Sequence, residues 1–192
     1  MARGSGVHGA FVEGRKRHLM ADLTGTLVEI GSGTGANLGF LPDGLRIIGV
    51  DPNPFMHAYY RREARSRERV SNQVRGVGEA LPFPDDSIDS VLSTLVLCSV
   101  PGLERTLGEI HRVLKPGGRL LFIEHVAAPE GSWLRRFQRA ARPVWSRIGD
   151  GCRPDRTTGE TLKEAGFRKV RVDRFSVPLP LVSPHISGFA EK

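Results

Sequence analysis

A glycine-rich turn between a buried strand and a helix sets the first limit on the fold. Residues 26–30 are mostly apolar, and the next five residues read Gly31-Ser32-Gly33-Thr34-Gly35. Glycine suits a backbone that turns tightly and lies against a ligand, because a side chain would collide there. The pattern predicts the first unit of an α/β fold, with a ligand bound at the turn.

Strand-like and helix-like patterns alternate along the rest of the chain. Such alternation is typical of strands that cross over through helices to form a parallel sheet, so we expect an α/β sandwich. The expected strands cover residues 26–30, 45–50, 72–77, 89–94, 119–124, 169–175 and 186–190. The expected helices are a short one before Pro42, one over 54–67, an amphipathic one over 103–114, one over 133–148, and a last one that closes at Gly166.

Three local signals refine these elements. Lys115-Pro116-Gly117-Gly118 predicts a turn that ends the preceding helix. Pro143 is expected to kink the helix over 133–148. Thr157-x-x-Glu160 predicts a capping box at the start of the last helix.

The helix over 133–148 carries an apolar stripe surrounded by arginines. The stripe consists of Trp133, Phe137, Ala140, Val144 and Ile148. We expect Trp133 and Phe137 to pack in the core, and we keep two further interpretations of the stripe. It could cover a lipophilic substrate as a lid, or it could rest on an anionic membrane surface.

The length of 192 residues fits one domain. The longest apolar stretch, residues 91–100, is far shorter than the roughly 20 residues that span a bilayer. The first 25 residues are basic but lack an apolar segment followed by a small-residue cleavage site, so we expect no signal peptide. A cytoplasmic location is the resulting expectation.

The net charge of +7 comes from the last third of the chain. Residues 1–130 hold 15 Lys or Arg and 15 Asp or Glu, whereas residues 131–192 hold 13 and 6. A positive field there fits an anionic substrate, a membrane surface or nucleic acid, although genome base composition also enriches arginine. Cys98 and Cys152 lie far apart and form no metal or redox spacing, so we expect free thiols and no metal.

The glycine turn alone leaves two ligands open. Gly31-x-Gly33-x-x-Ala36 satisfies the dinucleotide fingerprint, and Asp51 could hold the ribose hydroxyls of either NAD or an adenosine ligand. A dinucleotide enzyme also needs a second mononucleotide half and a substrate region, which 192 residues hold with difficulty.

Ordered motifs behind the turn closely resemble class I S-adenosylmethionine-dependent methyltransferases. The motifs are Glu29-x-Gly31-x-Gly33-x-Gly35, Asp51, Gly78-Glu79-Ala80-Leu81-Pro82-Phe83-Pro84-Asp85, Ser87-Ile88-Asp89 and Glu109-Ile110-His111-Arg112-Val113-Leu114-Lys115-Pro116-Gly117-Gly118. The resemblance covers residues 26–125. It implies a Rossmann-like three-layer sandwich with a central, mostly parallel seven-stranded sheet and an antiparallel last strand.

Further motifs resemble the methyltransferase-like seven group, whose animal members are thiol S-methyltransferases. These motifs are Gly35-Ala36-Asn37, Asp51-Pro52-Asn53-Pro54, Thr94-Leu95-Val96-Leu97-Cys98-Ser99-Val100, Glu124-His125-Val126-Ala127-Ala128, Asp150-Gly151-Cys152 and Pro184-His185-Ile186. The resemblance implies one domain over 1–192, with an N-terminal segment (1–25), a cofactor-binding part (26–125) and an acceptor lid with the C-terminal strands (126–192). Animal members carry a hydrophobic N-terminal anchor that this sequence lacks, so membrane residence is not carried over.

The same resemblance implies S-adenosylmethionine as cofactor and S-adenosylhomocysteine as product, without a metal. The implied cofactor-binding residues are Glu29, Gly31, Ser32, Gly33, Asn37, Asp51, Pro52, Met56, Gly78, Glu79, Thr94 and Leu95. Glu29 would orient the loop or accept from the ammonium, and Asp51 would accept from the ribose hydroxyls. Many family members have an acidic residue at the position of Val77, so adenine recognition here would depend on the backbone and on Gly78 and Glu79.

The implied reaction is methyl transfer to a small, lipophilic acceptor. A thiol is the expected acceptor, and a phenol, quinone or amine is the alternative. The catalytic candidates are His125, Asp150 and His185, and His125 would lie at the carboxyl edge of the sheet. A protein that only binds S-adenosylmethionine, and a nicotinamide oxidoreductase, remain as alternatives. Nucleic acid is not an expected partner, because two tyrosines and two tryptophans offer few stacking platforms.

Overall fold

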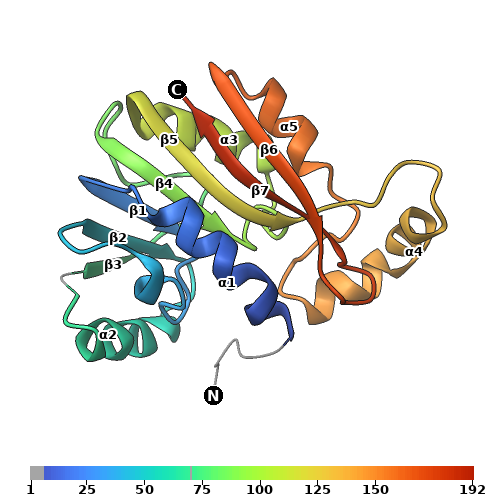
Figure 1. Ribbon diagram of the computed structural model, residues 1–192, viewed down its shortest axis with the longest axis horizontal. Helices are drawn as coiled ribbons and strands as arrows, with labels where there is room; N and C mark the ends of the chain where they lie inside the picture. The colour runs from blue at the N-terminus through green and yellow to red at the C-terminus, as the bar shows by residue number, and fades with distance from the viewer. Residues whose placement is uncertain (1–6, 70) are drawn as a thin grey trace.

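Among the described residues, seven strands form one central sheet in the order β3-β2-β1-β4-β5-β7-β6 (Figure 1). The computed structural model describes residues 7–69 and 71–192. The strands are β1 (Thr26–Ile30), β2 (Arg46–Asp51), β3 (Ser71–Arg75), β4 (Ile88–Thr94), β5 (Leu114–His125), β6 (Lys169–Ser176) and β7 (Pro184–Glu191). The pairs from β3 to β5 are parallel, whereas β7 runs antiparallel to both β5 and β6. The expected seven-stranded, mostly parallel sheet with an antiparallel last strand is confirmed.

Helices cover both faces of this sheet, which makes the fold a three-layer sandwich (Figure 1). The helices are α1 (Val7–Met20), the 3₁₀ turn η1 (Leu38–Phe40), α2 (Met56–Ser66), α3 (Leu103–Val113), α4 (Trp133–Ile148) and α5 (Thr158–Glu164). The sequence patterns predict no helix at α1. The short helix expected after the glycine turn is only the single 3₁₀ turn η1.

Adjacent residues of β1 pack into two separate hydrophobic clusters. Val28 belongs to one cluster with Leu107 of α3, and Leu27 belongs to the other with Tyr60 of α2; all four are fully buried. Burial on both faces is typical of parallel strands between helix layers. This packing brings the carboxyl ends of β1, β2, β4 and β5 to one edge, where ligands of open α/β sheets bind.

α3 ends at Val113, as the stop signal predicts, but the turn expected at 115–118 is wrong. β5 runs from Leu114 to His125 without interruption, so the Pro-Gly-Gly sequence lies inside the strand. The pairing register with β4 shifts between Ile88 and Ser90, and Gly117 has a φ of +77°. Glycine in this left-handed conformation lets the strand bulge where a turn was expected.

The expected burial of Trp133 and Phe137 is also wrong. In α4 these side chains are 76% and 51% exposed, whereas Arg135 and Gln138 are buried. Gln138 accepts from the Ala128 N–H (2.8 Å) and donates to the Leu181 carbonyl (2.8 Å). The helix therefore attaches through its polar side and presents its apolar stripe outward.

Two smaller expectations concern helix ends and kinks. α4 continues through Pro143 as one helix. The capping box at α5 is wrong, because the Thr157 side chain makes no capping hydrogen bond within the part of the chain that the structure describes. No helix in the described part of the chain is long and apolar enough to cross a membrane.

Candidate functional site

The glycine turn after β1 lies directly against the loop that follows β4. Gly31 has a φ of +59°, and a Cβ on it would lie 2.4 Å from the Val96 Cγ2 atom. The Gly31 and Ser32 N–H groups both donate to the Val50 carbonyl, at 2.8 and 3.3 Å. A side chain at Gly31 would therefore push apart two segments that form one wall of the site.

Asp51, the last residue of β2, anchors the same turn. Its Oδ2 atom accepts from the Gly33 N–H and its Oδ1 atom from the Asn53 N–H, both at 2.8 Å. The residue is buried. Each carboxylate oxygen keeps a further lone pair, so the group can still accept from two vicinal hydroxyls of a ligand.

Glu29 and Asn37 form a buried polar pair in which two oxygen atoms accept no hydrogen bond within the described residues. The Asn37 Nδ2 atom donates to Glu29 Oε1 (2.6 Å) and to Thr94 Oγ1 (3.2 Å). Glu29 Oε2 and Asn37 Oδ1 are buried and find no hydrogen-bond partner among the residues that the structure describes. Burial raises the pKa of Glu29 from 4.5 to about 7, while the Asn37 hydrogen bond opposes that rise. Two buried acceptors without donors fit a cationic donor such as an ammonium group.

Ser32 holds the turn to the neighbouring strand. Its hydroxyl accepts from the Gln73 Nε2 atom at 2.8 Å, and Gln73 lies within 3.3 Å of the Gly33 carbonyl as well. Gln73 was not identified from the sequence. The signal was a polar side chain in the weakly apolar strand β3, directly beside β2.

The other edge of the site contains Pro52, Met56, Gly78 and Glu79. Met56 begins α2 and is partly buried, whereas Pro52 is exposed. The Glu79 carboxylate accepts from the Gly102 N–H (3.0 Å), so this side chain also fixes the start of α3. The contact of these residues with an adenine ring stays a prediction.

Glu124 organises the loop after β4 and was missed as a site residue. Its buried carboxylate accepts from Ser93 Oγ (2.7 Å) and from the N–H groups of Val96 (3.1 Å) and Cys98 (3.3 Å). Burial raises the pKa of Glu124, and the hydrogen bonds from Ser93 and Val96 oppose the rise. The available signal was an acidic residue at the end of an otherwise apolar strand. Leu95, at the start of this loop, has a φ of +58°.

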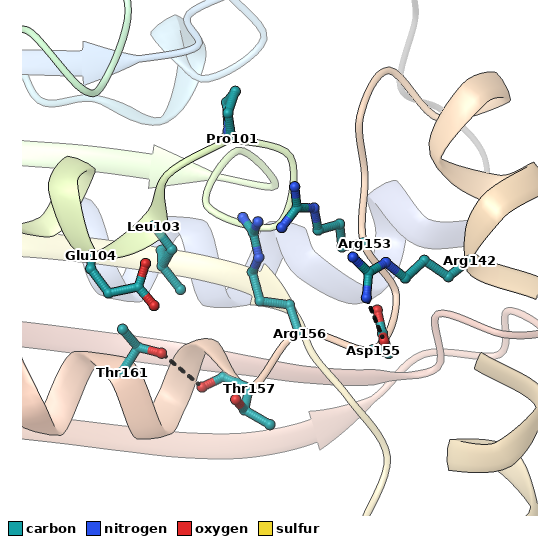
Figure 2. A pocket seen from close by; sticks show the side chains of 9 residues that line it. All are labelled: Pro101, Leu103, Glu104, Arg142, Arg153, Asp155, Arg156, Thr157 and Thr161. Carbon is teal, nitrogen blue, oxygen red and sulfur yellow. Dashed lines mark hydrogen bonds and ion pairs between the residues drawn. The ribbon is translucent and has the colours of Figure 1, made fainter. Parts of the chain in front are cut away.

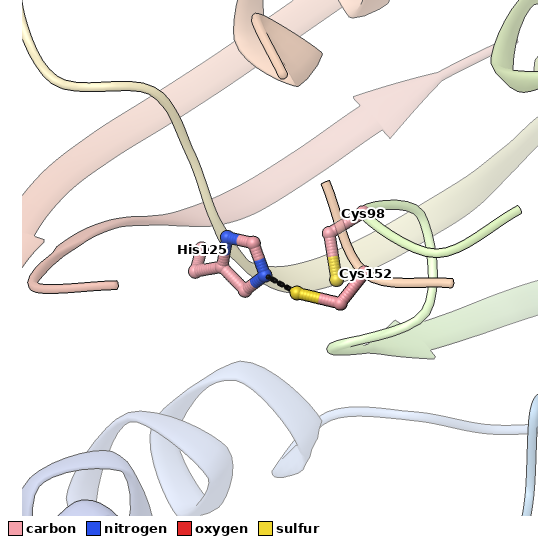
Figure 3. Close-up of side chains that lie close together, drawn as sticks. All are labelled: Cys98, His125 and Cys152. Atoms are coloured by element: carbon pink, nitrogen blue, oxygen red, sulfur yellow. Dashed lines mark hydrogen bonds between the residues drawn. The ribbon is translucent and has the colours of Figure 1, made fainter. Parts of the chain in front are cut away.

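Three side chains meet beyond the carboxyl ends of β4 and β5, and we call Cys98, His125 and Cys152 the sheet-edge cluster (Figure 3). The His125 Nε2 atom lies 2.7 Å from the Cys152 sulfur, and the Trp145 Nε1–H donates to the same sulfur at 3.0 Å. Hydrogen bonding between the two cysteines lowers the pKa of Cys152 and raises that of Cys98. Both cysteines are free thiols, as expected, but the structure brings them together with His125.

The other two catalytic candidates, His185 and Asp150, lie outside the sheet-edge cluster. The His185 ring packs against the His125 ring with 6.2 Å between centroids, because the two residues are paired in β7 and β5. His185 is buried and lies 3.1 Å from the Ser183 carbonyl through Nδ1. Asp150 is exposed in the turn that leads to Cys152, with a φ of +50°. The structure therefore brings His125 and His185 together and leaves Asp150 at the surface.

A basic pocket adjoins the segments that carry the two cysteines (Figure 2). Its lining residues are Pro101, Leu103, Glu104, Arg142, Arg153, Asp155, Arg156, Thr157 and Thr161. Arg156 donates to the carbonyls of Leu97 (2.6 Å) and Val100 (2.8 Å) and so fixes the loop around Cys98. Burial lowers the pKa of Arg156. Arg142 pairs with Asp155 at 3.5 Å, and Glu104 offsets a second arginine, so the pocket lining has only a small positive excess.

Comparisons with known proteins show what the chain is similar to. A family model described as a methyltransferase domain matches residues 28–122. The thiol S-methyltransferase TMT1B of Homo sapiens is 39% identical over 194 residues, which cover 94% of this chain and 80% of the relative. The thiol S-methyltransferase TMT1A of Homo sapiens is 40% identical, over 87% of this chain and 70% of the relative.

A solved structure supports the fold independently of these sequences. The crystal structure of the cyclase SpnF matches with a TM-score of 0.74 and 22% identity, and the match covers 93% of this chain and 80% of that chain. Such low identity shows the fold alone, because one fold hosts many reactions.

Proposed function

Because the chain belongs to the family of the thiol S-methyltransferases TMT1A and TMT1B, we propose that it methylates the sulfur of a small, lipophilic thiol. The chain is a class I S-adenosylmethionine-dependent methyltransferase. The observation that carries the thiol proposal is the identity of 39% to a thiol S-methyltransferase over 94% of this chain. Phenol, quinone and amine acceptors are the alternatives.

The residues of the site fit the cofactor that the family uses. Glu29 Oε2 and Asn37 Oδ1, the two buried acceptors without donors, would receive the ammonium of its methionine part. Asp51, fixed by the Gly33 N–H, would accept from the ribose hydroxyls. When bound, S-adenosylmethionine supplies a methyl group on a sulfonium, and its departure as neutral S-adenosylhomocysteine needs no proton.

The chain's own contribution is to position the acceptor and to exclude water. A thiol has an ordinary pKa near 8.5, so a fraction is ionised at neutral pH and little help from a base is needed. Of the three catalytic candidates, we propose that His125 contacts the acceptor, because its ring lies in the sheet-edge cluster. In this proposal His185 supports the His125 ring, and Asp150 belongs to the surface turn.

The exposed stripe of α4 supports a lipophilic acceptor and a membrane surface as partner. Trp133, Phe137, Val144 and Ile148 are all more than half exposed, and arginines flank them. Aromatic and aliphatic side chains beside arginines suit the boundary between headgroups and acyl chains of anionic lipids. We propose a cytoplasmic enzyme that touches such a surface peripherally and receives its acceptor there.

Release of S-adenosylhomocysteine across an acceptor panel tests the proposal. The panel holds a small alkyl thiol, a phenol, a quinol and an amine, and the Asp51→Ala variant serves as control. We expect release with the thiol alone, and none from the variant. Equal release without any acceptor, or release only with the phenol, quinol or amine, would refute the thiol proposal. A preparation that binds the cofactor but releases nothing would favour a protein that only binds it.

A further inference from the structure

The sheet-edge cluster has the composition of a metal site. The sequence does not reveal it, because the three residues are far apart in the chain. One ligand atom from each of Cys98, His125 and Cys152 lies within 4.8 Å of the others (Figure 3). The side chains are only 2%, 5% and 8% exposed, respectively. Three separate segments supply them, namely the loop after β4, the end of β5 and the turn after α4.

The distances require only small adjustments for a tetrahedral ion. Zinc binds thiolate at about 2.3 Å and imidazole at about 2.0–2.1 Å, which sets neighbouring ligand atoms about 3.5–3.8 Å apart. The His125 Nε2 to Cys152 Sγ distance of 2.7 Å would have to open by less than about 1 Å. The widest separation lies within 4.8 Å and would close by at most about 1 Å. Rotation of the cysteine side chains can supply such movements.

The backbone that carries these donors is held in place. The Arg153 N–H donates to the Cys98 carbonyl at 2.9 Å, which joins the two cysteine segments directly. Glu124 accepts from the Cys98 N–H, and the Cys152 N–H donates to the Gly149 carbonyl at 3.0 Å. A preformed arrangement of this kind lowers the entropic cost of binding an ion.

The donor set selects the class of metal. Two thiolates and an imidazole suit zinc and other soft ions, whereas magnesium and calcium prefer oxygen ligands. Glu124, which precedes His125 in sequence, already accepts three hydrogen bonds through its carboxylate, so we do not count it as a metal ligand. The Trp145 Nε1–H, 3.0 Å from the Cys152 sulfur, is the kind of outer donor that tunes a metal-bound thiolate.

We propose that Cys98, His125 and Cys152 bind one Zn²⁺ ion, whose fourth position receives the sulfur of the acceptor. Three protein ligands with an open fourth position are typical of catalytic rather than structural zinc sites. Within the cluster, Cys98 follows Thr94 and Leu95 in the loop where the resemblance expects the methionine part of the cofactor. The role of the fourth position rests on the proposed thiol acceptor, whereas the metal site itself does not.

The chemistry of the step balances without an oxidant or reductant. The acceptor thiol releases its proton to solvent as its sulfur binds the ion, because zinc strongly favours the thiolate. A lone pair of that sulfur forms the new bond to the methyl carbon, while the old carbon–sulfur bond breaks and its electron pair stays with S-adenosylhomocysteine. The methyl thioether product carries no charge and is a weak ligand, so water displaces it.

Metal content of the full-length protein tests the site directly. The protein is purified without a histidine tag, passed over a chelating resin and analysed by inductively coupled plasma mass spectrometry. We expect about one zinc per chain in the parent protein and at least a fivefold loss in Cys98→Ser, His125→Gln and Cys152→Ser. His111→Gln, a histidine of α3 outside the cluster, is the matched control and should keep its zinc.

Cobalt substitution gives a second readout that does not depend on variants. Co²⁺ in the parent protein should show a thiolate-to-metal charge-transfer band and the intense visible bands of a tetrahedral site. Circular dichroism and S-adenosylmethionine binding show that each variant is folded. Zinc below about a tenth per chain without cobalt bands, zinc retained by all three variants, or a Cys98–Cys152 disulfide in the reduced preparation would overturn the site.

Measurements of thiol methylation test the metal site and the proposed thiol acceptor separately. Loss of thiol methylation on chelation, regained with Zn²⁺ at unchanged S-adenosylmethionine affinity, supports both. Zinc bound by the cluster without thiol methylation refutes the thiol acceptor and leaves the metal site standing. Thiol methylation at full rate in the metal-free protein refutes the role of the fourth position and leaves the proposed function standing.

Discussion

Replacing Glu29 by glutamine should stabilise the free protein and weaken cofactor binding at the same time. Burial raises the pKa of Glu29 from 4.5 to about 7, so the folded state holds a proton that the unfolded chain has already lost. The stability that this proton gives is fully present below about pH 4.5 and disappears as the pH rises through about 7. At pH 8 the buried carboxylate therefore costs about 3 kcal/mol, since one pKa unit corresponds to about 1.4 kcal/mol.

Glutamine keeps the size of the side chain and removes this cost. For a chain of this length, 3 kcal/mol corresponds to a rise in melting temperature of about 6–12 °C at pH 8. The gain should fall to below about 1 kcal/mol at pH 5, where Glu29 of the folded parent protein is protonated while the unfolded chain has lost most of that proton. Loss of a hydrogen bond between the ammonium and a charged group costs about 1.5–3 kcal/mol, which weakens S-adenosylmethionine binding about 10- to 150-fold.

Thermal unfolding at pH 5 and pH 8, together with isothermal titration calorimetry, measures both effects. Glu63→Gln makes the same change on a partly exposed carboxylate of α2 and should alter neither quantity beyond about 0.5 kcal/mol. A Glu29→Gln protein that is less stable than the parent at pH 8 would refute the buried-charge argument. Unchanged affinity would refute the contact between Glu29 and the ammonium.

Three further predictions concern Asp51, Gly31 and the exposed stripe of α4. Asp51→Asn should lower S-adenosylmethionine affinity at least about 10-fold in calorimetry, because the amide loses the charge that accepts from the ribose; equal affinity would exclude that role. Gly31→Ala should cost about 1–3 kcal/mol in urea unfolding, because its Cβ would meet Val96 Cγ2 at 2.4 Å. A double-mutant cycle with Val96→Ala should show that this cost is coupled to Val96, and strict additivity would contradict the contact. The double variant Trp133→Ser, Phe137→Ser should keep its stability within about 1 kcal/mol and sediment less with anionic liposomes at low salt; undiminished sedimentation would exclude the stripe as the membrane contact.

The sheet could be predicted because its signals are local. The apolar segment 26–30, the glycine turn and Asp51 lie next to one another in sequence, and the structure has the strand at Thr26–Ile30 and Asp51 bonded to Gly33. The bulge in β5 could not be predicted, because Pro-Gly-Gly ordinarily ends an element. Pairing with β4 on one side and β7 on the other overrides that local preference.

Local sequence patterns could predict neither the exposed stripe of α4 nor the sheet-edge cluster, for two different reasons. An apolar stripe predicts a buried face only if another element covers it, and here Gln138 binds the Ala128 and Leu181 backbone from the opposite side. Cys98 and Cys152 are separated by 53 intervening residues, so no ligand spacing connects them. Only the tertiary fold brings their sulfurs to His125, and the hydrogen bond from Arg153 to Cys98 joins the two segments there.

Transfer of an isotopically labelled methyl group to an alkyl thiol is the most direct test of the account. The protein is incubated with methyl-labelled S-adenosylmethionine and the thiol, and the products are identified by mass spectrometry. We expect one labelled methyl thioether for each S-adenosylhomocysteine released, and neither product from Asp51→Ala. Cofactor binding without any labelled thioether, or label found only on an oxygen or nitrogen acceptor, would contradict it.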